Sequence, residues 1–539
     1  MKQHLFTYRH LLAVLLLFGL LVDACGGDGS TPPPAPGTQI PPAILAIMNK
    51  ATYSKATWGL RVVDLASGQL IYDREPEFNF HIASVRKLFS VGLALDTLGA
   101  DHKFSTPVHR NGTVAGGVLN GDLNLVASGD LTLGGRNTPE GTVAFTNFDH
   151  TEANSLGSAI LTPEDPLAGL NELAQQVAAA GITTVAGDVV IDDRLFIPFN
   201  FRGEFDVQPI VVNDDLVDVT ILPTTPGQLA TVEWGPQTAA LTVISTVTTV
   251  ASGGTTTVTL SPTSPGVGDV TGTIAVDFAP PLPGVKTLVQ TFRVTDPASF
   301  SRTAFIEALQ RAGITVTAPP TGPNPVEKLP PSDSYTPANE EANLVSLPYS
   351  EYAKLILKVS HNLGADLSLM YFGLAKGVNS LPAALGQERA TLTESFGLHG
   401  NDFNFIDGSG GGETLASTKA VLRLLQVMSG KPAFDAFFDA LPKLAEDGSL
   451  AEVTGFESDP SLAGAKGNVH AKTGTYIVLD GGQTLFKGQA FAGYIDAKSG
   501  RRLIYALCVD NAGVIKGIPD ILEVFNDEGT ISAIIWKDN

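Results

Sequence analysis

Between residues 106 and 334 the sequence is a long tract of short Thr- and Val-rich segments separated by glycine turns. Segments such as AGDVVID, LVDVTIL and ALTVISTVTTV favour β-strands. On both sides of this tract the pattern changes to segments with helical periodicity, such as YSEYAKLILKVSHNL and LASTKAVLRLLQVM. The simplest arrangement is a discontinuous α+β domain formed by residues 43–105 and 335–539, interrupted by one or more inserted β-rich domains over 106–334.

The flanking segments also predict individual elements. WGLRVVDL and QLIYD alternate apolar and polar residues around a glycine turn, and FAGYID and RRLIYALCV flank a second turn, so each pair predicts an antiparallel hairpin. A helix is expected to begin near Ser84, and PASFSRTAFIEALQRAGI predicts another that ends at Gly313. The discontinuous domain should therefore contain both a sheet and helices.

Charge and cysteine content exclude several classes of protein. The formal net charge of −21 argues against a nucleic-acid partner, because phosphate binding needs clustered cations. Only two cysteines occur, Cys25 and Cys508, which is too few for a disulfide framework or a cysteine-based zinc site. Cys508 lies in an apolar run and is expected to be a buried, unreactive thiol. We expect neither a metal nor a cofactor.

The N-terminus has the pattern of an export signal. Lys2 and Arg9 precede an apolar run from Leu11 to Val22, which is too short to span a bilayer as a helix. Residues 1–24 therefore predict a signal peptide, and Cys25 stands where a bacterial lipoprotein would be lipidated. A Gly- and Pro-rich tether over 25–42 follows. The protein should be periplasmic or in the cell envelope, anchored to a membrane, with an ordinary secretory signal as the alternative.

Three short motifs, each occurring once in the chain, carry the chemistry. They are Ser-x-x-Lys at Ser84 and Lys87, Ser-x-Asn at Ser360 and Asn362, and Lys-Thr-Gly at Lys472, Thr473 and Gly474. Their types and their order match the set found in serine β-lactamases and penicillin-binding proteins. Coincidence of all three is improbable in one chain, although a lone Ser-x-x-Lys would be a weak signal.

The first two motifs suit acyl transfer. Ser84 would attack an acyl carbonyl, with Lys87 one helical turn away to take its proton. Lys87 can act as a base only if burial and the second cation, Lys472, lower its pKa. Ser360 would relay a proton to the departing amine, and Asn362 would hold both Lys87 and a substrate amide.

The third motif suits recognition of a carboxylate. Lys472, Thr473, Gly474 and Thr475 lie in the strand-like segment NVHAKTGTYIV, where the ammonium and the hydroxyls would bind the substrate. The backbone amides of Ser84 and Thr475 would form the oxyanion hole. If Lys472 proves to be structural, Arg86 is the nearest other cation to the nucleophile.

Three other features compete with these motifs. Lys498-Ser499-Gly500 satisfies a loosened Lys-Thr-Gly pattern, but its place between two apolar strands predicts an exposed turn. Ser409 in IDGSGGGE lacks the first glycine of a nucleophile elbow, so a glycine-rich loop near the site is the better interpretation. His361 and His470 flank two motifs, yet no His-x-x-x-His pair supports a metal site.

With these motifs, the sequence resembles the D-alanyl-D-alanine carboxypeptidase/endopeptidase family, the class C low-molecular-mass penicillin-binding proteins. Beyond the motifs, the resemblance includes GDLNLVASGD, GITTVAGDVVIDDRLF, FRVTDPASF, FIDGSGGGE and HAKTGT. It implies a penicillin-recognising serine peptidase domain, of the β-lactamase/transpeptidase-like fold, with a large insertion. It also implies a D-Ala-D-Ala carboxypeptidase whose Ser84 is acylated by peptidoglycan stem peptides, and by β-lactam antibiotics as inhibitors.

The chain departs from the family pattern at two places. Leu131 replaces a usual proline, which should affect only a loop. The segment around Val453 lacks an arginine often found after Asp447-Gly448-Ser449-Leu450, and this second departure puts substrate preference in doubt. DD-endopeptidase activity stays open as a second activity. The alternatives are a β-lactamase-like esterase on the same fold and a catalytically silent cell-wall-binding lipoprotein.

Overall fold

The computed structural model describes residues 39–264 and 266–539. The predicted signal peptide, Cys25 and the tether up to residue 38 lie outside the described residues. Among the helices that are described, none combines the length and the apolar character needed to cross a membrane.

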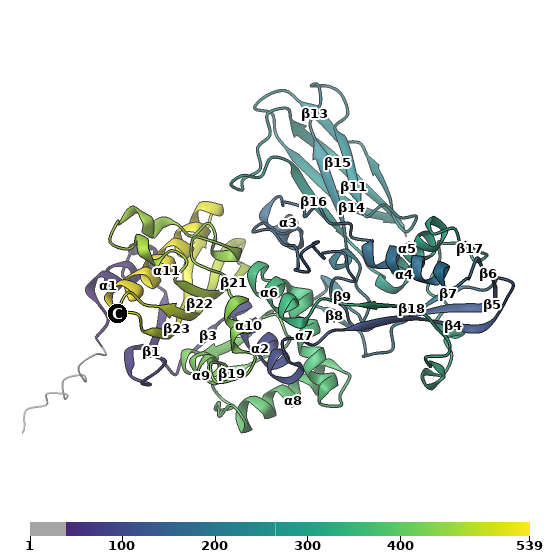
Figure 1. Ribbon diagram of the computed structural model, residues 1–539. Coiled ribbons are helices and arrows are strands. Elements are labelled where there is room, and N and C mark those ends of the chain that lie inside the picture. The colour runs from purple at the N-terminus through teal and green to yellow at the C-terminus, as the bar shows by residue number, and fades with distance from the viewer. Residues whose placement is uncertain (1–38, 265) are drawn as a thin grey trace, which may run out of the picture. The chain divides into compact units, whose positions relative to one another are not determined.

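Both ends of the described chain contribute to one antiparallel sheet. Its strand order is β2 (Leu70–Arg74), β1 (Thr57–Asp64), β23 (Arg502–Ile515), β22 (Gln483–Asp496) and β21 (Val469–Asp480). Figure 1 shows these strands side by side although they come from opposite ends of the sequence. The two predicted hairpins are β1–β2 and β22–β23, so both predictions are confirmed.

Both faces of this sheet are covered, which explains why its strands are almost continuously apolar. Along β23, Ile504 and Ala506 belong to a core shared with α2 (Lys87–Leu98) and α9 (Thr418–Met428), while Tyr505 and Leu507 belong to another core. This second core contains residues of α11 (Ile518–Asp538) and α1 (Pro42–Met48). The alternation follows from the two-residue period of a strand.

The remaining helices of the discontinuous domain pack against α2 or against one another. They are α6 (Tyr349–Val359), α7 (Asn362–Ala375), α8 (Leu381–Glu394) and α10 (Phe434–Asp439). A small sheet joins β3 (Asn79–His81) to β20 (Leu415–Ser417) and β19 (Phe403–Asn404). β3 leads directly into the turn that carries Ser84.

The tract 106–334 forms mainly strands, as its composition predicts. The largest sheet there has the order β17 (Thr315–Val316), β6 (Thr184–Val185), β5 (Val118–Val126), β4 (Ser105–Ala115) and β18 (Glu340–Val345), with β7 (Val189–Asp192) beside β5. Its helices are α3 (Ala153–Leu156), α4 (Ala168–Ala179) and α5 (Pro297–Arg311), and α5 confirms the predicted helix. Because β18 lies past residue 334 and pairs with β4, the exact domain boundaries stay a prediction.

Three smaller sheets complete this tract. One contains β11 (Thr231–Gly235), β10 (Leu216–Leu222) and β16 (Leu288–Arg293); another contains β12 (Thr242–Ser245), β15 (Val267–Ala275), β13 (Thr248–Val250) and β14 (Thr257–Ser264). The third is the hairpin of β8 (Phe199–Phe201) and β9 (Phe205–Val207).

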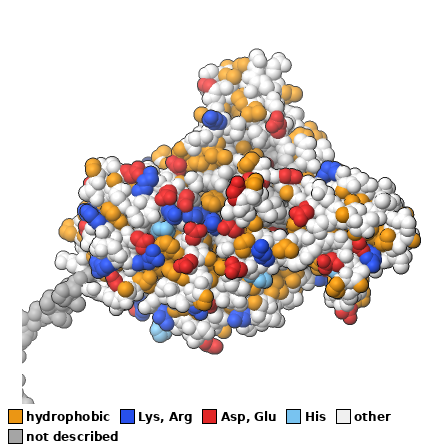
Figure 2. All heavy atoms as spheres, viewed as in Figure 1, with side chains coloured by type: hydrophobic (Ala, Val, Ile, Leu, Met, Phe, Trp, Pro, Cys, Tyr) orange, Lys and Arg blue, Asp and Glu red, His pale blue; other side chains and the backbone are white. Residues whose placement is uncertain are grey.

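On the face seen in Figure 2, acidic and basic side chains are intermingled rather than separated into large patches of one sign.

Candidate active site

Ser84 lies in a tight turn that is closely approached by β21 at Gly474 and by the loop at Gly410. The turn is the 3₁₀ helix Ala83–Arg86, directly before α2, and Ala83 adopts a positive φ of 42°. A Cβ on Gly474 of β21 would lie 2.1 Å from the Ile82 carbonyl oxygen, and a Cβ on Gly410 would lie 2.0 Å from that of Ala83. Only glycine permits such close approaches, so Gly474 lets the strand reach the serine.

Lys87, the first residue of α2, is fully buried beside this turn. Its Nζ lies 2.7 Å from Ser84 Oγ, 2.8 Å from Asn362 Oδ1 and 2.8 Å from the main-chain oxygen of Ser409. Two of these partners stay acceptors in either protonation state of the amine. A neutral Lys87 would therefore turn its lone pair to Ser84 and accept the hydroxyl proton.

The environment of Lys87 adjusts its basicity. Burial is the largest influence and lowers the pKa of Lys87 to about 7, although the carboxylates of Glu152, Asp366 and Asp407 act in the opposite direction. A lysine with this pKa is substantially neutral near pH 7. It can therefore serve as a general base for the serine beside it.

The Ser-x-Asn motif stands where the chain reverses between two helices. The predicted helical segment YSEYAKLILKVSHNL is in fact α6 and α7, because Ser360 ends α6 in the left-handed conformation, with φ 64° and ψ 36°. Asn362 begins α7 and contacts Lys87. Among the hydrogen bonds of the described residues, none joins Ser360 Oγ to Ser84 or Lys87, so of the two motif residues only Asn362 bonds the amine.

The Lys-Thr-Gly motif lies on β21, an edge strand of the five-stranded sheet. Lys472 is fully buried, and its Nζ donates to the Thr473 carbonyl oxygen at 2.8 Å. Burial, followed by the charge of Lys87, holds the pKa of Lys472 well below its usual range. Thr473 Oγ1 donates to Ser449 Oγ at 2.9 Å, and Thr475 Oγ1 donates to Gln489 Oε1 at 2.7 Å.

The glycine-rich loop predicted near the site does contact it. Asp407 accepts hydrogen bonds from the backbone N–H groups of Ser409, Gly410 and Gly411, and Asp366 accepts one from Gly408. Burial, followed by the neighbouring Asp407, raises the pKa of Asp366 to about 7. The loop also brings the main-chain oxygen of Ser409 to Lys87.

Several residues near the site were not identified from the sequence. Ser449 and Gln489 are the hydroxyl partners described above, and Ser449 belongs to a segment that stood out only for its departure from the family pattern. Glu152 and Arg202 come from the inserted tract, and both act on the charge of Lys87. Arg202 lies in the β8–β9 turn, 2.5 Å from where a Cβ on Gly411 would be. Nothing in the local sequence marks either residue.

The structure removes three competing candidates. Arg86 is fully buried and ion-paired with Glu388 at 2.6 Å, so the suggestion that it is an alternative carboxylate receptor is wrong. His470 stacks on Phe438, and burial lowers its pKa to about 4. The turn at 498–500 is exposed, as predicted. Within residues 39–264 and 266–539, no group of three or more His, Cys, Asp or Glu side chains is arranged to hold a metal ion.

Two further predictions concern buried residues. Cys508 is buried, as expected, and burial raises the pKa of its thiol well above the usual value. Leu131, which was expected to affect only a loop, is fully buried in the core around α2 and α7. Its side chain lies 2.8 Å from where a Cβ on Gly364 would be, so this departure from the family pattern fills space beside the first turn of α7.

Comparisons with known proteins concern the chain as a whole. The sequence matches the profile of the D-Ala-D-Ala carboxypeptidase 3 (S13) family over residues 43–522. It is 28% identical over 475 residues to a D-alanyl-D-alanine carboxypeptidase of Actinomadura sp. (strain R39), covering 81% of this chain and 76% of that protein.

Solved structures show the same fold at low sequence identity. Penicillin binding protein 4 (dacB) from Haemophilus influenzae superposes with a TM-score of 0.65 at 16% identity, covering 90% of this chain and 98% of that chain. Its complex with a novel β-lactam gives a TM-score of 0.64 at 17% identity, covering 92% and 99%. This likeness confirms the predicted α+β fold class.

Proposed function

Because the chain belongs to the D-Ala-D-Ala carboxypeptidase 3 (S13) family, it is a serine-type D-Ala-D-Ala carboxypeptidase, and we propose that Ser84 is its nucleophile. The observation that carries this assignment is the 2.7 Å contact between Ser84 Oγ and Lys87 Nζ, with Asn362 on the same amine. Family membership sets aside the alternative of a catalytically silent lipoprotein.

The proposed acylation step transfers one proton to Lys87 and forms one covalent bond. Ser84 Oγ attacks the carbonyl carbon of the penultimate D-alanine of a peptidoglycan stem peptide, and Lys87 Nζ takes the hydroxyl proton. The tetrahedral intermediate collapses as its C–N bond breaks. The leaving D-alanine receives the proton through Ser360, which then takes it from Lys87. The product is an ester on Ser84.

Recognition of the substrate uses β21. An edge strand has backbone groups free to pair with an extended peptide, which suits a stem peptide lying beside Ser84. Lys472 would bind the terminal carboxylate, and the hydroxyls of Thr473 and Thr475 would turn from Ser449 and Gln489 to donate to it as well. The close fit at Gly474 supports an oxyanion hole formed by the backbone N–H groups of Ser84 and Thr475.

The same acyl-enzyme accounts for two further activities in the proposal. A peptide cross-link offers the same carbonyl with a larger amine leaving group, so DD-endopeptidase activity needs no additional catalytic group. A β-lactam offers a strained amide that acylates Ser84, while the ring keeps its leaving amine attached, so penicillins should bind as inhibitors. Hydrolysis of β-lactams or esters on this fold is the alternative, and it differs only in the speed of deacylation.

Labelling with a penicillin tests the nucleophile. We expect one covalent adduct per chain, located on the peptide that contains Ser84 by mass spectrometry, and none in Ser84→Ala. Ser409→Ala is a matched control, because Ser409 also contacts Lys87 but only through its main-chain oxygen. Its adduct should still map to Ser84. An adduct on Ser409 or any other serine would refute the assignment.

Action on peptidoglycan requires export of the protein, and a lipid anchor would hold it at the membrane. We propose that residues 1–24 direct export and that Cys25 is lipidated, which places the enzyme at a membrane in the cell envelope. Cys25→Ser should move the protein from the membrane fraction to the soluble periplasmic fraction, measured by immunoblotting after cell fractionation. If parent and variant are both soluble, the segment is an ordinary secretory signal and the anchor is wrong.

A further inference from the structure

The inserted tract reaches the Ser-x-Asn motif through a strained turn. Residues Asn213, Asp214 and Asp215, between β9 and β10, have positive φ values of 52°, 55° and 56°. Non-glycine residues rarely adopt this conformation, and each costs about 1 kcal/mol or more unless its surroundings enforce it. A strained turn suggests a function when the side chain that it positions makes a specific contact.

Asp214 is the residue that this turn places, and its two carboxylate oxygens face different parts of the protein. Oδ2 accepts from Arg136 at 2.6 Å and from His150 at 2.8 Å, both within the inserted tract. Oδ1 accepts from His361 at 2.8 Å. Although burial alone would raise it, the pKa of Asp214 is held well below its usual range by Arg136 and His361. The carboxylate therefore stays charged and joins the insertion to the motif.

The contacts of His361 determine which of its nitrogens carries the proton. Its Nδ1 accepts the backbone N–H of Gly364 at 3.0 Å, which caps the N-terminus of α7. A nitrogen that accepts cannot carry a proton, so the proton is on Nε2 and is donated to Asp214. The ring is thus fixed from both sides. Because His361 stands between Ser360 and Asn362, the backbone of both motif residues is fixed with it.

We propose that Asp214 is a positioning residue of the active site, which acts through His361 to hold Ser360 and Asn362 toward Lys87. This inference rests on the proposed function, since it presumes that those two residues serve acylation. It also gives the inserted tract a part in catalysis, because the turn at 213–215 supplies the acceptor that keeps the left-handed Ser360 in place. Without this acceptor, Asn362 would hold Lys87 less firmly.

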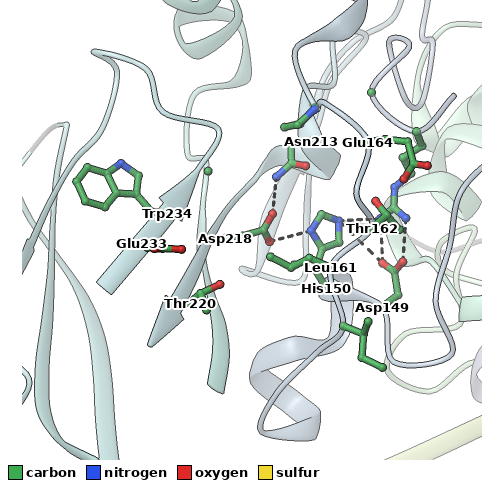
Figure 3. A pocket seen from close by; sticks show the side chains of 15 residues that line it. Asp149, His150, Leu161, Thr162, Glu164, Asn213, Asp218, Thr220, Glu233 and Trp234 are labelled. Carbon is green, nitrogen blue, oxygen red and sulfur yellow. Dashed lines mark hydrogen bonds and ion pairs between the residues drawn. The ribbon is translucent and has the colours of Figure 1, made fainter. Parts of the chain in front are cut away.

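The network behind Asp214 explains why this acceptor is rigid. His150 Nδ1 contacts Asp218 at 2.8 Å, and Arg136 also pairs with Asp149 at 2.8 Å, so the partners of Asp214 are themselves held. Figure 3 shows His150 between Asp218 and the Asp149 carboxylate. These residues line a cavity of about 270 Å³. Asp214 cannot move toward the active site without breaking these contacts.

His361→Asn is the sharpest test, because it separates the two functions of the ring. Asparagine is a good N-cap and should keep the bond to Gly364, but it is too short to reach Asp214. We expect the maximal acylation rate constant of a chromogenic β-lactam to fall about 5- to 30-fold, with little change in the half-saturating concentration. Asp214→Asn should act in the same direction, and the double variant should lose no more than the larger single effect, because one contact is removed.

Asp188→Asn is the matched control. Asp188 is also a buried aspartate of the inserted tract, paired with Arg302 at 2.5 Å on α5, so its loss reports general weakening of that tract. If His361→Asn and Asp214→Asn both acylate within about twofold of the parent, or only as slowly as Asp188→Asn, the inference is wrong. A parent protein that is not acylated at Ser84 would instead refute the proposed function. The two failures are therefore distinguishable.

Discussion

Lys87→Met is expected to lower the rate constant for acylation of Ser84 by about 10²- to 10⁴-fold, the usual contribution of a positioned general base. Methionine keeps most of the volume of this buried side chain but has no amine to accept the serine proton. The fold should survive, since removing the amine also removes the cost of burying it. The measurement is the rate of adduct formation with a labelled β-lactam, alongside thermal unfolding of the same samples.

The pH dependence of the acylation rate gives a second, independent test of Lys87 as the base. With a pKa of about 7, Lys87 is protonated and inactive at low pH, so acylation by the parent should rise as pH increases through about 7 and then level off. In Lys87→Met this rise should disappear. Lys431→Met is a suitable control, because Lys431 pairs with Asp96 on the same helix, α2, and should leave both rate and profile unchanged. A flat parent profile, or a variant that acylates normally, would contradict the role of Lys87.

The sheet and its hairpins could be predicted because local pattern and tertiary environment agree there. The strands of β22 and β23 are apolar on both faces, and the structure buries both faces. The discontinuous domain was predicted from the change of sequence pattern on the two sides of the inserted tract, and strands from both ends of the chain share one sheet. The helix break at Ser360 was missed, because a serine between two helical patterns carries no local stop signal.

The site residues within motifs could be located, whereas those held by long-range contacts could not. Ser84 and Lys87 are three positions apart, and a helical turn brings them together whatever surrounds them. Glu152 and Asp214 reach the site only because the inserted tract folds against α7. Their sequence neighbourhoods are ordinary acidic turns. The prediction for Arg86 failed for the opposite reason. Arg86 is close to Ser84 in sequence, which suggested that it could bind the substrate carboxylate, but its side chain is buried and paired with Glu388.

Lys472→Met should reduce acylation by a peptide that ends in a free carboxylate much more than acylation by a matched ester. Lys472 is fully buried, so a substrate carboxylate that meets it is removed from water, and the loss of one partner of such a pair costs about 2–5 kcal/mol. This corresponds to a decrease of about 30-fold to about 5 × 10³-fold in specificity for the peptide. The blocked ester does not form the pair and should be much less affected. Lys498→Met, in the exposed turn of similar sequence, should leave both substrates unaffected.

The same variant should move the pH dependence of the bound state to higher pH. In the free protein, burial and Lys87 keep the pKa of Lys472 low, and an arriving carboxylate raises it. The charged Lys472 then disfavours a proton on Lys87, so the base is free when the peptide is in place. Without Lys472, the uncompensated carboxylate would instead favour protonated Lys87, and the rise of the acylation rate at saturating peptide should occur at higher pH. If both substrates lose equally and the profile does not move, Lys472 is a structural lysine of β21, and the carboxylate is recognised by other residues.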